Sequence, residues 1–219
     1  MDGLGASGKS ALARLLAERL GFAHLNSGLL YRAAAYLAIR AQAPLDDGHA
    51  VAAEVKRHTI ELRRDSALGS VVAIDGIVRE SELMSRPISE AASQVAKHRE
   101  VRELFLKVQR AAFEPLGVVA EGRDMGTVVF PDAPVKFFVE ARLDVRAARR
   151  LEQLTASGQG GELAAIRQEL AARDERDASR ATAPMKPADG AIIIDNSDSP
   201  LEETVLRMLS FVQCDRKPS

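Results

Sequence analysis

The first residues with a chemical signature form a glycine-rich run that ends in a lysine and a hydroxyl. Residues 3–10 read Gly-Leu-Gly-Ala-Ser-Gly-Lys-Ser, which matches the phosphate-binding pattern G-x-x-x-x-G-K-[ST]. The glycines allow backbone N–H groups to turn toward phosphate oxygens, and the helix that follows presents its positive end. In this pattern Lys9 reaches the β- and γ-phosphates of a nucleotide, and the Ser10 hydroxyl is the expected ligand of Mg²⁺.

The alternative is a glycine-rich helix start that binds nothing. We prefer the phosphate loop because a well-patterned helix follows it over residues 10–20, with leucines at helical spacing and Gly21 as a stop. A phosphate loop normally follows a buried strand, yet only Met1 and Asp2 precede Gly3. We therefore expect either that the chain as given begins late or that its sheet lacks a first strand.

Arginines beside predicted loops and helix ends are candidates to hold the transferred group. Arg173, Arg176 and Arg180 are spaced i, i+3, i+7 and share one helical face. A phosphoryl transferase needs cations over the transferring group, although a solvated helix laced with acidic residues would show the same stripe. The remaining candidates are Arg32 and Arg123, whereas the arginines of the preceding helix (Arg142, Arg146, Arg149 and Arg150) are expected mostly at the surface.

Arg123 and Asp124 directly follow a predicted buried strand, within the stretch Gly122–Thr127. Ligands of open α/β sheets bind beyond the carboxyl ends of the strands, so both side chains should project into that crevice. Arg123 suits a phosphate. Asp124 could hold Mg²⁺, accept a proton or accept a hydrogen bond from an exocyclic amine, and the alternative for the pair is a mutual salt bridge.

The elements that must position these residues alternate between strands and helices. Apolar runs predict buried strands at residues 23–26, 118–120, 135–139 and 191–194. Short β runs at 58–64, 70–74 and 77–79, with Asp75-Gly76 as a hairpin turn, predict a small antiparallel sheet. Helices are expected from residue 28 to at least Ile39, over 87–113, over 143–181 and after Ser199. In the last of these, the residues that should face the core are Val205, Met208, Leu209 and Val212. The fold class is α/β, a parallel sheet with an insertion.

Composition excludes several classes of protein. The chain has 219 residues, 46% hydrophobic and 28% charged, which suits one large globular domain. A net charge of −1, with no tryptophan, argues against nucleic acid as a partner, and no apolar run is long enough to span a membrane. A single cysteine, Cys214, four scattered histidines without metal-ligand spacing and no signal peptide predict a cytoplasmic protein.

Taken together, these motifs resemble those of the bacterial cytidylate kinases, which are P-loop nucleoside monophosphate kinases. The resemblance covers nearly the whole chain, and its most specific part is Gly122-Arg123-Asp124-Met125-Gly126-Thr127. It further rests on Asp2-Gly3 with Gly8-Lys9, on residues 25–32 and 91–96, on Val101-Arg102, on 128–133, and on 173–177 with Arg180. The sequence departs from the family pattern at Leu4-Gly5-Ala6 and at Met84, where an arginine is common.

The resemblance implies a single kinase domain over 1–219. Its core would be 1–27, 103–141 and 185–219, with a monophosphate-binding insertion at 28–102 and a helical lid at 142–184. It implies ATP as co-substrate with Mg²⁺ on Ser10, and CMP and dCMP as small-molecule substrates of a monomer. The implied ATP contacts are Gly3, Leu4, Gly5, Ala6, Ser7, Gly8, Lys9, Ser10 and Ala11.

The resemblance also assigns roles to individual side chains. Ser27, Arg102, Asp124 and Arg180 would recognise cytosine; Ser93, Arg173 and Asp177 would meet the sugar; Arg32 and Arg123 would hold the acceptor phosphate. Lys9, Arg123, Arg173 and Arg180 would be the catalytic cations. Two alternatives remain open from the residues alone: a small-molecule kinase of the shikimate or gluconate type, with Asp124 as base, and a nucleotide-binding module without catalysis.

Overall fold

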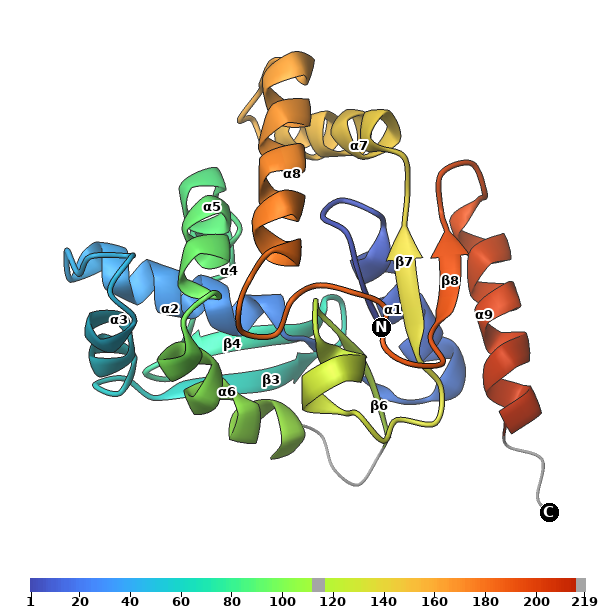
Figure 1. Ribbon diagram of the computed structural model, residues 1–219, viewed down its shortest axis with the longest axis horizontal. Helices are drawn as coiled ribbons and strands as arrows, with labels where there is room; N and C mark the ends of the chain where they lie inside the picture. The colour runs from blue at the N-terminus through green and yellow to red at the C-terminus, as the bar shows by residue number, and fades with distance from the viewer. Residues whose placement is uncertain (112–116, 216–219) are drawn as a thin grey trace. The chain divides into compact units, whose positions relative to one another are not determined.

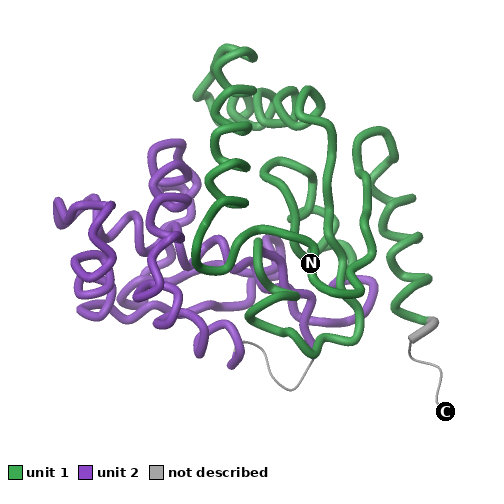
Figure 2. Tube along the Cα trace, viewed as in Figure 1, with its two compact units in different colours: residues 1–16, 123–219 green, residues 17–122 purple. Residues whose placement is uncertain are grey.

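The computed structural model describes residues 1–111 and 117–215 (Figure 1). The chain divides into two compact units, residues 1–16 with 123–219 (unit 1) and residues 17–122 (unit 2), shown in Figure 2. This division follows packing within the chain, so the core, insertion and lid inferred from the family resemblance stay predictions.

Unit 1 contains a parallel sheet in the order β1-β7-β8. Its strands are β1 (Asp2–Gly3), β7 (Phe137–Glu140) and β8 (Ile192–Asp195). Asp2 pairs with Phe138, which in turn pairs with Ile193. The predicted strands at 135–139 and 191–194 are confirmed with small shifts. The first strand, which the sequence led us to expect missing, is present as the two residues of β1.

The helices of unit 1 are α1 (Lys9–Leu20, up to Leu16), α7 (Leu143–Ala156), α8 (Leu163–Ala178), α9 (Leu201–Asp215) and a short π-helix, η1 (Met125–Val129). The single helical stretch predicted over 143–181 is two helices, because the intervening Gly158 and Gly160 adopt positive φ angles. Helices α7 and α8 pack through Ala147, Leu154, Ile166 and Leu170. Val205 and Met208 of α9 are fully buried, as predicted.

Unit 2 contains two further sheets. Strands β2 (Ala23–Asn26) and β6 (Val118–Glu121) pair in parallel, and β3 (Ile60–Asp65), β4 (Gly69–Ile74) and β5 (Ile77–Val78) form the predicted antiparallel sheet. Asp75 and Gly76 both have positive φ, as the hairpin turn requires.

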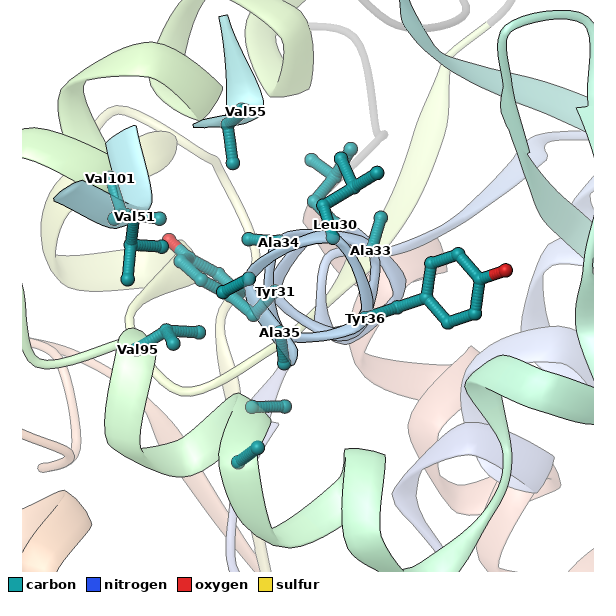
Figure 3. Packing of buried hydrophobic residues seen from close by; sticks show 14 of the residues in the cluster. Leu30, Tyr31, Ala33, Ala34, Ala35, Tyr36, Val51, Val55, Val95 and Val101 are labelled. Carbon is teal, nitrogen blue, oxygen red and sulfur yellow. The ribbon is translucent and has the colours of Figure 1, made fainter. Parts of the chain in front are cut away.

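The helices of unit 2 surround an apolar core. They are α2 (Gly28–Arg40), α3 (Gly48–Val55), α4 (Glu80–Leu83), α5 (Arg86–Val95) and α6 (Arg99–Ala111). Figure 3 looks along α2, with Tyr31 pointing toward Val51, Val95 and Val101 and Tyr36 on the opposite side of the helix. Tyr31 also meets the ring of Phe105 edge-on, with centroids 5.6 Å apart.

The single helix predicted over 87–113 is wrong. It is interrupted between α5 and α6, and residues 112 and 113 lie outside the described part of the chain. At the break the guanidinium of Arg102 donates to the carbonyl of Ala96 at 2.9 Å, and the His98 ring binds the carbonyl of Leu45 at 2.8 Å. One local and one long-range hydrogen bond therefore stabilise a break that no glycine or proline marks. Over the described residues, no helix has both the length and the apolar character needed to cross a membrane.

Candidate active site

The phosphate loop lies in unit 1 between β1 and α1. Its backbone requires glycine at two points: Gly3 has φ +144°, and a Cβ there would lie 2.0 Å from the carbonyl oxygen of Val139. Gly8 has φ +87°, and a Cβ there would lie 2.5 Å from the Asn196 amide nitrogen. Lys9 is buried at the start of α1, and Ser10 is exposed beside it. The predicted loop and helix are therefore present, with the lysine enclosed at the helix N-terminus.

Asn196, just after β8, fixes the middle of the phosphate loop. Its side-chain amide donates to the carbonyl of Ser7 at 2.8 Å, and its own oxygen accepts from the Thr204 hydroxyl at 3.3 Å. The Ser7 hydroxyl donates back to the carbonyl of Leu4 at 3.0 Å. These contacts hold the carbonyls of Ser7 and Leu4 in hydrogen bonds within the protein.

Helices α7 and α8 hold the same loop at Gly5. The Asp174 carboxylate accepts the Gly5 N–H at 3.4 Å, and Arg146 donates to the Gly5 carbonyl at 3.1 Å and to Asp174 at 2.5 Å. Arg146 is only 5% exposed, so the expectation that the arginines of its helix lie mostly at the surface is wrong for this residue. The sequence placed Arg146 among arginines expected mostly at the surface and gave Asp174 no role. Both lie far from Gly5 in the chain, by 141 and 169 residues, so no local pattern pairs them with the loop.

Three arginines gather around the buried carboxylate of Asp177, and we call this group the arginine cluster. Arg123 donates its Nε–H to Asp177 at 3.0 Å, while Arg173 and Arg180 have a guanidinium nitrogen 3.9 Å from the carboxylate. Arg176, predicted on the same face as Arg173 and Arg180, also lies on α8 and is partly buried. A Cβ on Gly5 would lie 3.6 Å from a terminal nitrogen of Arg123, so the cluster adjoins the phosphate loop.

Burial and neighbouring charges shift the pKa values of Asp177 and Arg173 in the arginine cluster. Burial alone would raise the pKa of Asp177, but the charges of Arg123, Arg180 and Arg173 outweigh it and hold that pKa below its ordinary value. Burial, together with the charge of Arg123, lowers the pKa of Arg173 to about 10, so Arg173 remains a cation at neutral pH. Crowded cations of this kind favour an added anion such as a phosphate.

Asp124 is 2% exposed and lies in the chain between β6 and η1. Its carbonyl accepts the N–H groups of Val128 and Val129 at 2.9 and 3.2 Å, which closes the π-helical turn. The next two N–H groups, of Met125 and Gly126, donate to the carboxylate of Asp2. The predicted pair of Arg123 and Asp124 is thus held on an ordered turn, and Arg123 also donates to Asp177 at 3.0 Å.

Unit 2 carries the other four predicted substrate residues. Ser27 is buried at the end of β2, where its hydroxyl donates to the carbonyl of Glu121 at 2.8 Å. Arg32 on α2 donates to the carbonyl of Leu83 at 2.8 Å and to the hydroxyl of Ser89 at 3.0 Å. Ser93 is buried one turn further along α5.

Arg102, the fourth of these residues, stacks on Tyr31, with its guanidinium carbon 5.3 Å from the ring centre. Two of the unit 2 arginines, Arg32 and Arg102, are therefore held by carbonyl groups and aromatic packing. The structure brings together Arg123, Arg173, Asp177 and Arg180 in unit 1, and it describes the unit 2 residues separately.

The described residues provide few metal ligands. Residues 1–111 and 117–215 contain no group of three or more His, Cys, Asp or Glu side chains that could hold a metal ion. Mg²⁺ in nucleotide enzymes keeps several waters and is held largely by substrate phosphates. An exposed Ser10 hydroxyl at the helix start suits an ion that arrives with phosphates, and Ser10 as its ligand stays a prediction.

A glycine-rich loop between a parallel strand and a helix, with buried arginines beside it, defines a P-loop phosphotransferase. The comparisons with known proteins are more specific. Residues 1–214 match the cytidylate kinase family, and the chain belongs to that family.

Among its relatives are three bacterial proteins named cytidylate kinase. The protein from Pasteurella multocida is 40% identical over 214 residues, covering 97% of this chain and 93% of its own length. The Geobacillus protein is 39% identical over 212 residues (97% and 94%), and the Burkholderia pseudomallei protein is 41% identical over 211 residues (96% and 90%).

Proposed function

We propose that this protein transfers the γ-phosphoryl group of ATP to the 5′-phosphate of CMP or dCMP, which gives ADP and CDP or dCDP. It is then a phosphotransferase with a phosphate group as acceptor, acting as a monomer. The observation that carries the proposal is that Arg123 of the arginine cluster lies beside the phosphate loop, where a Cβ on Gly5 would be 3.6 Å from its terminal nitrogen. The names of the relatives supply the acceptor, because they are cytidylate kinases.

The reaction brings two anions together, so charge neutralisation is the main task of the side chains. The acceptor phosphate oxygen is already ionised near neutral pH, and no general base is required. We assign the catalytic charge to Lys9, Arg123, Arg173 and Arg180. Binding of the acceptor phosphate is assigned to Arg32 and Arg123. Mg²⁺, when bound with ATP on the Ser10 side, would add further positive charge to the phosphates.

Specificity for cytosine is assigned to Ser27, Arg102, Asp124 and Arg180. A carboxylate such as Asp124 can accept a hydrogen bond from the N4 amine of cytosine, whereas the O4 of uracil is itself an acceptor. Leaving a buried polar group unpaired costs about 1–3 kcal/mol, which corresponds to roughly 5- to 150-fold discrimination. Ser93, Arg173 and Asp177 are assigned to the sugar.

The test is ADP release by the purified chain with ATP, Mg²⁺ and one acceptor at a time: CMP, dCMP, UMP, AMP or shikimate. We expect rapid turnover with CMP and dCMP. Turnover with shikimate in their place would show that Asp124 acts as a base on an alcohol. Nucleotide binding without turnover of any acceptor would show a binding module and would overturn the proposal.

A further inference from the structure

The carboxylate of Asp2 is bound on both oxygens by the backbone of the segment that follows Asp124. One oxygen accepts the Met125 N–H at 2.7 Å, and the other accepts the Gly126 N–H at 2.8 Å. Asp2 is 3% exposed, so water does not compete for either oxygen. Charged hydrogen bonds of this length, in a buried place, are among the stronger ones in proteins.

Asp2 itself sits on a fixed strand directly before the phosphate loop. It pairs with Phe138 of β7, and beyond Gly3 the N–H of Leu4 donates to the carbonyl of Val139 at 3.1 Å. The close approach of Gly3 to Val139 leaves no room for a side chain at Gly3. Because β1 fixes Asp2, the backbone groups that bind its carboxylate are held in place relative to β1 and the phosphate loop.

The amides that Asp2 binds, of Met125 and Gly126, come directly after Arg123 and Asp124, which are both assigned to substrate. Asp124 has φ −147° and ψ 23°, outside the helical region, and its carbonyl is already used by Val128 and Val129. The Asp2 bonds to Met125 and Gly126 fix the backbone directly after it. Without them, the chain between β6 and the π-helical turn would lose its link to the phosphate loop strand.

We propose that Asp2 is a positioning residue, whose carboxylate sets Asp124, and with it Arg123, relative to the phosphate loop. The inference rests on the proposed function, because Asp124 is the residue assigned to the cytosine amine. It assigns a role to a side chain that the motif of the phosphate loop does not include.

The geometry at Asp2 requires a carboxylate, not only an acceptor. Each of its oxygens takes a separate N–H, so an asparagine would place its NH₂ group against one of the two donors. Asp65 offers a matched contrast, since one of its oxygens accepts both the Ala67 and Leu68 N–H groups, each at 2.8 Å. An asparagine can replace Asp65 without losing either bond.

The experiment compares Asp2→Asn with Asp65→Asn in steady-state assays with CMP and UMP as acceptors. We expect Asp2→Asn to lower the ratio of kcat/KM for CMP over UMP by about fivefold or more, while Asp65→Asn leaves it unchanged. The ratio is independent of the fraction of active enzyme, so a merely structural loss of folded protein would not move it. An unchanged ratio in Asp2→Asn overturns the proposal.

Amide hydrogen exchange tests the role of Asp2 without depending on the phosphorylation of CMP. If the wild-type protein does not phosphorylate CMP, the proposed function fails, and amide exchange over residues 123–129 decides about Asp2. Faster exchange at Met125 and Gly126 in Asp2→Asn supports the positioning role, and unchanged exchange overturns it. If Asp2→Asn does not fold, exchange is measured in the wild type alone. The positioning role requires that the amides of Met125 and Gly126 exchange slowly there, and exchange as fast as in exposed loops overturns it.

Discussion

Asp177 is 2% exposed, and its carboxylate lies 3.0 Å from Arg123 and 3.9 Å from both Arg173 and Arg180. Three guanidinium groups would repel one another in so small a space without it. Removing one partner from a buried charged group is much more costly than removing an exposed ion pair, because the remaining charges stay desolvated. The carboxylate is therefore expected to stabilise the fold as well as to orient the arginines.

Replacing this carboxylate should destabilise the protein in a pH-dependent way. For Asp177→Asn we expect a loss of about 3–5 kcal/mol in the free energy of unfolding at pH 7, measured by urea denaturation. The pKa of Asp177 is lowered in the folded state. Its contribution is therefore complete above the unfolded pKa of about 3.9 and is lost as the pH falls through the folded pKa.

The difference between Asp177→Asn and the wild type should thus be constant from pH 7 to about 5 and shrink below about 4. Asp144→Asn is the control, since Asp144 is 72% exposed and 3.9 Å from Arg142. Equal stability of Asp177→Asn and the wild type at pH 7 would contradict the argument.

Lys9 is the residue whose removal should affect chemistry without affecting the fold. It is enclosed at the first turn of α1, where its ammonium group is expected to meet the β- and γ-phosphates. We expect Lys9→Ala to lower kcat for CMP phosphorylation by at least about 100-fold, with an unchanged circular dichroism spectrum. Lys56→Ala, at an exposed lysine, is the control, and near-normal turnover in Lys9→Ala would refute the assignment.

The β4–β5 hairpin of unit 2 is tied to helix α3 through His58. Its Nδ1 lies 2.6 Å from Asp75 in the turn, and its Nε2 lies 3.2 Å from Glu54 of α3. The hydrogen bond with Asp75, opposed by burial and aided by Glu54, raises the pKa of His58. The contacts with Asp75 and Glu54 therefore favour the protonated form of His58 in the folded protein.

This link predicts the opposite pH dependence from that of Asp177. A raised folded pKa gives stability that is complete below the unfolded pKa of about 6.5 and is lost as the pH rises through the folded pKa. The melting temperature of His58→Gln should thus fall further below that of the wild type at pH 6 than at pH 9. His49→Gln, at a side chain that is 88% exposed, should show little difference at either pH. A larger gap at pH 9 would show that the charge of His58 is not what links the hairpin.

Sequence reasoning succeeded where a short segment carries its own signal. The apolar strands, the Asp75-Gly76 turn and the phosphate loop are all local patterns, and all are present. It failed where distant residues decide: at the break between α5 and α6 the His98 ring binds the carbonyl of Leu45, 53 residues earlier, and the π-helical turn is held by Asp2, 123 residues before Met125. No local pattern marks such partners, for the same reason that it missed Arg146 and Asp174.

The net charge of the whole chain is −1, so total charge does not point to the proposed phosphate site. Basic residues gather locally around Asp177 and Gly5, where Asp177 and Asp174 balance part of their charge. A net charge near zero is therefore compatible with a compact site for a nucleotide phosphate. A kinase of this type must bind two nucleotides on one chain, and each should stabilise the folded protein independently of turnover.

Thermal denaturation with each nucleotide separates the two proposed binding functions. At 100 times the dissociation constant a ligand adds about 2.7 kcal/mol, which for a chain of this size is a shift of roughly 5–11 °C in melting temperature. We expect Lys9→Ala to lose most of the shift caused by ATP and keep that caused by CMP. Asp124→Asn should do the reverse, because its carboxylate is assigned to cytosine and not to ATP. If both variants lost both shifts equally, the two nucleotides would not have separate binding residues, and the assignment of Lys9 to ATP and Asp124 to CMP would be wrong.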